Sequence, residues 1–206
     1  MTDKKKDWVG NSRSIWSTNG CSNHCDTDRE VNDFYATDPV AIDKLAKKFP
    51  IPHHVWECAC GQGHLSERLK QRGHSVYSSE LEHRGYGVQG VNFLTTEDIP
   101  VGLPANDMCI LTNPPYRYTT EFVLHALDIL PENGYAIFLL KTTALEGKGR
   151  FERIYKITPP IFIFQFVERL QCAKSGDFDN IGGSAQAYAW FVWKKGYKGP
   201  TILDWI

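Results

Sequence analysis

Four consecutive residues, Asn113-Pro114-Pro115-Tyr116, could together hold a planar amine. They follow residues 107–112, which we expect to form a strand, and ligand sites in open α/β sheets lie at the carboxyl ends of strands. The two prolines stiffen the backbone and remove two N–H donors, so the exposed groups are acceptors: the Asn113 side-chain oxygen and the Pro114 carbonyl. Tyr116 adds a ring on which a heterocycle can stack. The alternative, a Pro-Pro turn followed by a core tyrosine, leaves the asparagine unexplained.

A second motif, Glu57-Cys58-Ala59-Cys60-Gly61-Gln62-Gly63, lies where a strand is expected to turn into a helix. Glycines there let the backbone approach a ligand closely, and the helix N-terminus presents free N–H groups. Glu80 follows Gly61 by 19 positions, which suits an acid that binds ribose hydroxyls. Ser66 stands where a dinucleotide fingerprint has its last glycine, so the motif favours an adenosine-containing cofactor other than NAD. A tight turn without a ligand is the alternative.

Alternating strands and helices must position these motifs. Strands are expected at residues 54–58, 74–78, 87–91, 108–111, 135–140, 161–167 and 187–193. Helices are expected after Asp38-Pro39, after Gly63, around residues 123–130 and at residues 149–155. This order predicts an α/β fold with a mainly parallel, seven-stranded sheet covered by helices on both faces. The last two strands have no helix between them, which predicts an antiparallel pair at one edge.

Composition bounds the function further. The 206 residues suit one domain, at residues 34–206, preceded by a polar arm at residues 1–33. The net charge is −1, which excludes a uniformly basic nucleic-acid coat. The apolar runs are far shorter than the roughly 20 residues of a membrane helix, and the first ten residues do not form a signal peptide. We therefore expect a cytoplasmic protein with reduced cysteines and no membrane partner.

Three stretches carry a resemblance to a known family. Residues 113–116 (NPPY) resemble the catalytic motif of S-adenosylmethionine-dependent adenine-N6 DNA methyltransferases. Residues 56–66 (WECACGQGHLS) resemble their cofactor loop, and residues 34–39 (FYATDP) are similar to the segment that holds the methionine end of the cofactor. The motif order also matches, over an architecture of roughly residues 34–195. The chain resembles small phage or prophage members of the group, which implies a Rossmann-like class I methyltransferase fold.

The resemblance implies roles for single residues. The expected contacts to S-adenosylmethionine come from Tyr35, Thr37, Glu57, Gly61, Gly63, Glu80, Asn92 and Phe93. Asn113 and Pro114 would accept hydrogen bonds from the target amine, Pro115 would stiffen the motif, and Tyr116 would stack on the base. The family usually has aspartate at the Asn92 position, where the acid meets the cofactor's exocyclic amine. Asn92 can accept that bond without charge assistance, so cofactor affinity is expected to be weaker.

Other functions fit the same motif. RNA adenine and protein glutamine are methylated by families that share Asn-Pro-Pro-Tyr, and a binding module that has lost turnover is favoured by the departure at Asn92. For the leading substrate, DNA, residues 141–174 hold seven basic and three acidic side chains. This patch could track phosphates, or it could be an ordinary solvated surface. The expected contacts are Lys141, Lys148, Arg150, Arg153 and Arg169.

No metal site is expected. Cys21, His24 and Cys25 lie close together in the arm, but structural zinc usually needs a second spaced pair of ligands, and none follows. A polar arm segment is the interpretation that we prefer.

Overall fold

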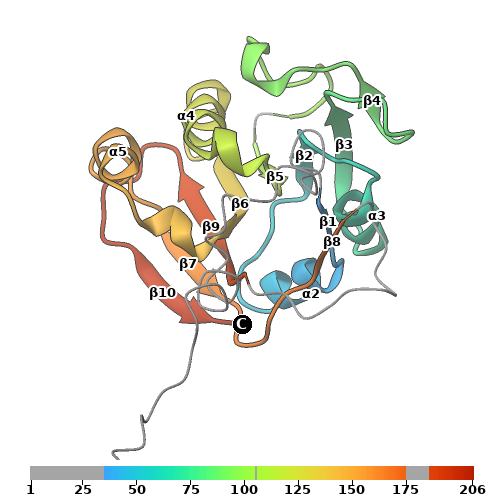
Figure 1. The fold of residues 1–206 in the computed structure, drawn as a ribbon. Coiled ribbons are helices and arrows are strands. Elements are labelled where there is room, and N and C mark those ends of the chain that lie inside the picture. Colours follow the sequence, from blue (N-terminus) through green and yellow to red (C-terminus); the bar gives the residue numbers. More distant parts are fainter. Residues whose placement is uncertain (1–34, 105, 175–185) are drawn as a thin grey trace, which may run out of the picture.

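An eight-stranded sheet forms the centre of the structure (Figure 1). The computed structural model describes residues 35–104, 106–174 and 186–206, so the predicted arm and the cysteine cluster at 21–25 lie outside the described residues. The strand order is β10-β7-β9-β6-β5-β2-β3-β4. The strands are β2 His54–Glu57, β3 Ser75–Glu80, β4 Val88–Gln89, β5 Met108–Thr112, β6 Tyr135–Lys141, β7 Phe162–Gln165, β9 Tyr188–Lys194 and β10 Ile202–Trp205.

The sheet differs from the prediction at one edge. Strand β9 is antiparallel to β6 and to β7, and every other neighbouring pair is parallel. The predicted antiparallel pair therefore exists, but β10 pairs with β7 and makes the edge. The sheet has eight strands and not seven. Strand β10 escaped prediction because Ile202, Leu203 and Trp205 are all about half exposed, so the strand lacks a buried face that a pattern could reveal.

Helices cover both faces of the sheet, as predicted (Figure 1). The helices α2 Val40–Ala46 and α3 His64–Gln71 pack on one face, and α4 Thr119–Ile129 packs on the other with α5 Lys148–Arg150 and the π-helical turn Phe151–Tyr155. Asp38 starts α2, because its carboxylate accepts the Val40 N–H at 2.9 Å. No helix in the described part of the chain is long and apolar enough to span a bilayer.

Alternation along the central strands explains the two-sided core. In β6, Ile137 and Leu139 face the cluster under α2 and α3, whereas Phe138 and Leu140 face the cluster under α4. All four side chains are fully buried, as expected for a central strand covered on both faces. The same alternation in β9 buries Trp190 on the first face, where its indole N–H donates to the Ala41 carbonyl at 3.0 Å and ties α2 to the sheet.

A second, two-stranded sheet brings the start of the described chain to the ends of the central strands. Strand β1 (Tyr35–Thr37) pairs antiparallel with β8 (Cys172–Lys174). Strand β8 lies between the predicted strands at residues 161–167 and 187–193, where the sequence analysis expected no strand, so it corrects that prediction. The pairing sets Thr37 opposite Cys172 and fixes β1 beside the motif that follows β5.

Candidate functional site

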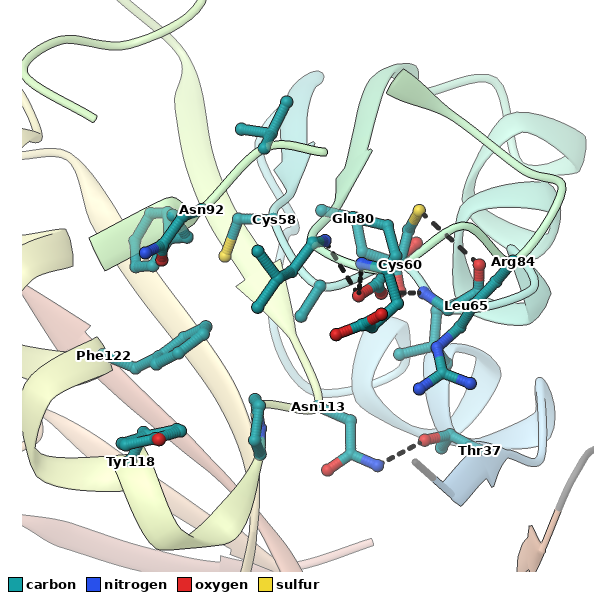
Figure 2. A pocket seen from close by; sticks show the side chains of 18 of the residues that line it. Thr37, Cys58, Cys60, Leu65, Glu80, Arg84, Asn92, Asn113, Tyr118 and Phe122 are labelled. Carbon is teal, nitrogen blue, oxygen red and sulfur yellow. Dashed lines mark hydrogen bonds between the residues drawn. The ribbon is translucent and has the colours of Figure 1, made fainter. Parts of the chain in front are cut away.

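A cleft of about 270 Å³ opens where β1, β2, β3 and β5 end (Figure 2). This is the side of the sheet on which α/β proteins bind ligands. Eight of the residues singled out from the sequence line it: Thr37, Glu57, Gly61, Glu80, Asn92, Phe93, Asn113 and Pro115. Three others, Gly63, Pro114 and Tyr116, lie outside its lining. Tyr35 opens β1, and its side chain lies outside the described part of the structure.

Glu57 ends β2 at the floor of the cleft and is 2% exposed. The Ser66 hydroxyl, from α3, donates to its carboxylate and is itself bonded to the Ser78 hydroxyl at 2.6 Å. Burial raises the pKa of Glu57 from its ordinary 4.5 to about 8, against the opposing effect of the Ser66 hydrogen bond. A buried carboxyl of this kind favours a cationic neighbour, because a cation compensates for the lost hydration of the charged form.

The raised pKa of Glu57 should be visible in the pH dependence of the free energy of unfolding. The folded-state value lies above the ordinary one, so Glu57 stabilises the fold most below about pH 4.5, and this contribution is lost as the pH rises to about 8. Relative to Glu57→Gln, the free energy of unfolding of the unmodified protein should therefore fall with rising pH in that window, by at most about 1.4 kcal/mol per pH unit. Urea unfolding of both proteins from pH 5 to pH 9 measures the difference. Parallel pH profiles would contradict the assignment.

Glu80 ends β3 and organises the glycine loop rather than simply facing the cleft. One carboxylate oxygen accepts the Gly61 N–H at 2.7 Å, and the other accepts the N–H groups of Leu81 (2.9 Å) and Glu82 (3.2 Å). The sequence predicted Glu80 as a ligand for ribose hydroxyls, and its carboxylate does line the cleft. Each carboxylate oxygen has two lone pairs, so these bonds leave acceptor capacity at Oε2.

The two motif glycines have different functions. Gly61 lines the cleft with a φ of 56°. Gly63 lies at the start of α3 with a φ of 85°, and a Cβ there would come within 2.6 Å of the Tyr86 ring. Gly63 is therefore needed for a left-handed turn and for close packing against Tyr86, not for the lining of the cleft.

One half of the cleft is aromatic. The Phe93 and Phe122 rings lie 4.9 Å apart, and Tyr118 and Asn92 lie beside them (Figure 2). The Asn92 side-chain oxygen accepts the Leu94 N–H at 3.1 Å and so caps the short turn that carries Phe93. This half can accept a planar apolar ring, with the Asn92 amide at its edge.

Asn113 forms the opposite wall, directly after β5. Its amide nitrogen donates to the Thr37 hydroxyl at 2.9 Å (Figure 2), so the strand β1 holds the amide plane in place. Pro114 is buried behind it, and the Pro115 carbonyl accepts the Tyr118 N–H at 2.9 Å. The sequence analysis expected Asn113 at the carboxyl end of this strand and the prolines as its support. It did not expect the bond by which Thr37 holds the Asn113 amide.

Tyr116 lies in a different place from the one that a stacking role suggests. Its hydroxyl is buried, and its ring packs among the core residues beneath α2 and α3, 6.1 Å from the Tyr188 ring. The Lys141 ammonium lies 4.5 Å from the centre of the ring. Burial raises the pKa of Tyr116 well above its ordinary value, so the phenol stays neutral. Stacking of a base on Tyr116 stays a prediction, and Lys141 covers one face of the ring in this structure.

The predicted basic patch is only partly directed at solvent. The Arg150 guanidinium donates to the carbonyls of Ala144 (2.8 Å) and Thr143 (3.0 Å), and Arg153 pairs with Glu121 at 3.2 Å. Arg150 and Arg153 thus stabilise their own neighbourhood, and their contact with phosphates stays a prediction. Lys148 and Arg169 are exposed, and Lys141 covers the Tyr116 ring.

The sequence analysis missed further residues that line the cleft, among them Arg84, Arg117, Tyr118 and Phe122. Tyr118 and Phe122 are four positions apart at the start of α4, a spacing that places both on one side of a helix and could have revealed them. Arg117 lies over the Tyr118 ring at 4.7 Å. Arg84 belongs to the loop after β3, for which the sequence offers no comparable signal.

Two cysteines of the glycine loop, Cys58 and Cys60, are protonated thiols and therefore poor nucleophiles. Both line the cleft and both are buried free cysteines. Burial raises the pKa of Cys60 to about 12, and that of Cys58 well above its ordinary value. Neither forms a thiolate at neutral pH, so both act as packing groups beside the loop.

Comparison with solved structures decides the fold. A protein from Listeria monocytogenes, provisionally named a class I S-adenosylmethionine-dependent methyltransferase, superposes with a TM-score of 0.53 at 12% identity. The match covers 81% of this chain and 61% of that one. A predicted O-methyltransferase from Agrobacterium tumefaciens gives a TM-score of 0.54 at 12% identity, over 82% of this chain and 85% of the other. The fold is that of the class I methyltransferases.

The fold alone does not define a reaction. A protein from Lactococcus lactis, provisionally named a hemolysin, superposes with a TM-score of 0.56 at 13% identity, over 82% of this chain and 91% of that one. The sequence matches no family model and no curated protein. The predicted Rossmann-like class I fold is thus confirmed, with the change in strand number described above, and function rests on the residues of the cleft.

Proposed function

We propose that the chain is a methyltransferase that uses S-adenosylmethionine to methylate the N6 amine of adenine in DNA. One observation carries the proposal. Asn113 is held by Thr37 at the carboxyl end of β5, on the wall of a cleft that also contains the carboxylates of Glu57 and Glu80. The fixed amide oxygen of Asn113 suits an amine substrate. The carboxylates of Glu57 and Glu80 on the cleft floor suit the cationic and hydroxyl groups of an adenosine-containing methyl donor.

The donor set of the cleft fits S-adenosylmethionine. The aromatic half offers Phe93 and Phe122 for the adenine ring, and Asn92 lies at its edge. Glu80 can accept from ribose hydroxyls, and buried Glu57 suits the methionine ammonium. When bound, the cofactor supplies a methyl group on a positively charged sulfur.

The chain's own residues then act on the acceptor amine. An aromatic amine is a poor nucleophile because its lone pair is delocalised into the ring. The Asn113 side-chain oxygen and the Pro114 carbonyl would each accept a hydrogen bond from one N–H group of the amine. These two bonds favour the pyramidal form of the amine and localise its lone pair on the nitrogen. Thr37 holds the Asn113 amide in the orientation that this requires. The rate enhancement comes from positioning and electrostatic complementarity, and the amine needs no deprotonation before transfer. As the N–C bond forms, the C–S bond of the donor would break to leave a neutral thioether, and the methylated amine would then lose one proton to water.

DNA is the favoured acceptor, and its adenine must leave the helix or be unpaired to reach the Asn113 wall. Arg117 and Tyr118 line the aromatic half of the same cleft, and the exposed cations Lys148 and Arg169 could contact phosphates. The cytoplasmic location stays a prediction.

Salt dependence tests the phosphate contacts. If Lys148 and Arg169 bind phosphates, the double variant Lys148→Ala/Arg169→Ala should flatten the plot of log affinity against log salt by up to about 0.9 for each phosphate that is no longer neutralised. Fluorescence anisotropy with an adenine-containing duplex from about 50 to 300 mM salt measures the slope. The matched control is Lys47→Ala, which removes an exposed lysine at the C-terminal end of α2. A slope as steep in the double variant as in the control would place the DNA elsewhere.

Asn92→Asp tests the expected weakness in the cofactor site. Aspartate keeps the cap on the Leu94 N–H and adds charge to the acceptor at the edge of the aromatic half. Affinity for S-adenosylmethionine should hold or rise by up to about tenfold, as measured by calorimetry. A sharp loss would mean that Asn92 contacts the cofactor through its NH₂ group.

Labelled methyl transfer to duplex DNA, single-stranded DNA, RNA and protein in parallel tests the function itself. The proposal expects label on DNA, in N6-methyladenine after hydrolysis. Label on RNA or on glutamine would move the activity to the other families that share the motif. Binding of nucleic acid without binding of S-adenosylmethionine at millimolar concentration would show a binding module.

A further inference from the structure

The polar half of the cleft combines three carboxylates with one arginine. Glu57, Glu80 and Glu82 line this half, and Arg84 reaches into it from the loop after β3 (Figure 2). Figure 2 shows the guanidinium extending toward Thr37, on the side of the cleft opposite the aromatic residues. Such a set of charges suits a zwitterion: carboxylates for its cationic groups and a guanidinium for its anionic group.

The loop that carries Arg84 is held against α3. The Tyr86 hydroxyl donates to the Glu67 carboxylate, and the Lys70 ammonium donates to the same hydroxyl at 2.7 Å. Lys70 also lies 5.0 Å from the centre of the Tyr86 ring. The ring packs so closely on Gly63 that no side chain fits there. These contacts fix the loop two residues from Arg84, so the guanidinium is presented to the cleft from an anchored segment.

The other positive groups of the cleft are less suited to an anion in this half. Arg117 stacks on Tyr118 at the aromatic end, 4.7 Å from that ring. His64 also lines the cleft, but burial lowers its pKa and so favours its neutral form. Thr37 offers a hydroxyl without charge.

We propose that Arg84 binds the carboxylate of the cofactor's methionine moiety and thereby orients the cofactor along the cleft. This inference rests on the proposed function and goes beyond it, because neither the motif nor the glycine loop includes Arg84. It also explains the division of the cleft: the ring would lie in the aromatic half, the ribose at Glu80, the ammonium at Glu57 and the carboxylate at Arg84.

Binding of two ligands to two proteins tests the inference without an activity measurement. The ligands are S-adenosylmethionine and its decarboxylated form, which lacks only the carboxylate. Wild-type protein should bind the first about 10- to 100-fold more tightly than the second, as expected for a charge-assisted pair. Arg84→Gln should lose this preference by weakening S-adenosylmethionine alone. Arg84→Lys should restore part of it, and Arg72→Gln, an arginine paired with Asp43 outside the cleft, should keep all of it.

The outcomes separate the two proposals. If wild-type protein binds neither ligand, the proposed function fails. If it binds both, and Arg84→Gln weakens both equally or neither, the function stands and the assignment of Arg84 is overturned. Tyr86→Phe adds a second route if Arg84→Gln does not fold: it removes the hydroxyl contacts of the loop and keeps the ring. The preference for the carboxylate should fall in that variant too, and an unchanged preference would contradict the inference.

Discussion

Replacing Asn113 by alanine should leave S-adenosylmethionine binding nearly intact and lower methyl transfer by about 10²- to 10³-fold, as expected for the loss of one transition-state hydrogen-bond partner. The hydrogen bond between Gly61 and Glu80 on the cleft floor does not involve Asn113. The Asn113 amide donates instead to the Thr37 hydroxyl. The cofactor half should therefore survive the change. Calorimetry for binding and a single-turnover assay for transfer measure the two effects separately.

Thr37 provides a matched pair for this prediction. Thr37→Val removes the hydroxyl that fixes the Asn113 amide at nearly constant volume, whereas Thr37→Ser keeps it. Transfer should fall in the valine variant, by less than in Asn113→Ala, and should stay close to wild type in the serine variant. Near wild-type transfer by Asn113→Ala on any amine substrate would show that this chain is not the enzyme proposed.

Tyr116 and Tyr118 should respond differently. Tyr116→Ala should weaken transfer by an amount equivalent to about 1–3 kcal/mol of stacking, and Tyr116→Phe should be mild because it keeps the ring. Tyr118 lies in the aromatic half with Phe122, so Tyr118→Ala should instead weaken cofactor binding. If only Tyr118→Ala lowers affinity for the base, the stacking surface is Tyr118, and Tyr116, whose hydroxyl is buried, is a core residue.

The sequence was sufficient wherever a local pattern determines the structure. The apolar run at residues 135–140 located β6, whose side chains alternate between two buried faces in the structure, and Asp38-Pro39 marked the start of α2. Eight predicted site residues line one cleft, because the carboxyl ends of parallel strands meet at one edge of a sheet. A fold rule, not local spacing alone, brought them together.

The missed features depend on contacts between distant segments. Strand β10 is an exposed edge strand, recognisable only from its pairing with β7. The inward position of Tyr116 depends on its contacts with Tyr188 and Lys141. Arg150 donates to two backbone carbonyls, and such bonds cannot be predicted by counting charged residues in the sequence. Arg84 lines the cleft from a loop in which Tyr86 packs on Gly63, a residue at the start of a different element.

The second large effect is expected at Glu80. Removing this carboxylate with alanine would test a ribose contact, but the same carboxylate also accepts three backbone N–H groups. Glu80→Gln is the sharper change, because both carboxylate oxygens accept N–H donors and one of them becomes an NH₂ group. Affinity for S-adenosylmethionine should fall about 10- to 100-fold, and the free energy of unfolding should fall by about 1–3 kcal/mol. Glu132→Gln, on the exposed turn before β6, should change neither quantity.

A ligand change separates the ribose contact from the loop contact. S-adenosylhomocysteine and its 2′,3′-dideoxy form differ only in the ribose hydroxyls. If Glu80 binds those hydroxyls, their removal should weaken binding to wild-type protein and have little further effect on Glu80→Gln, because partners in one interaction are not additive. Equal losses from the deoxy ligand in both proteins would mean that Glu80 acts only by holding the Gly61 loop, and that the ribose is bound by another group of the cleft.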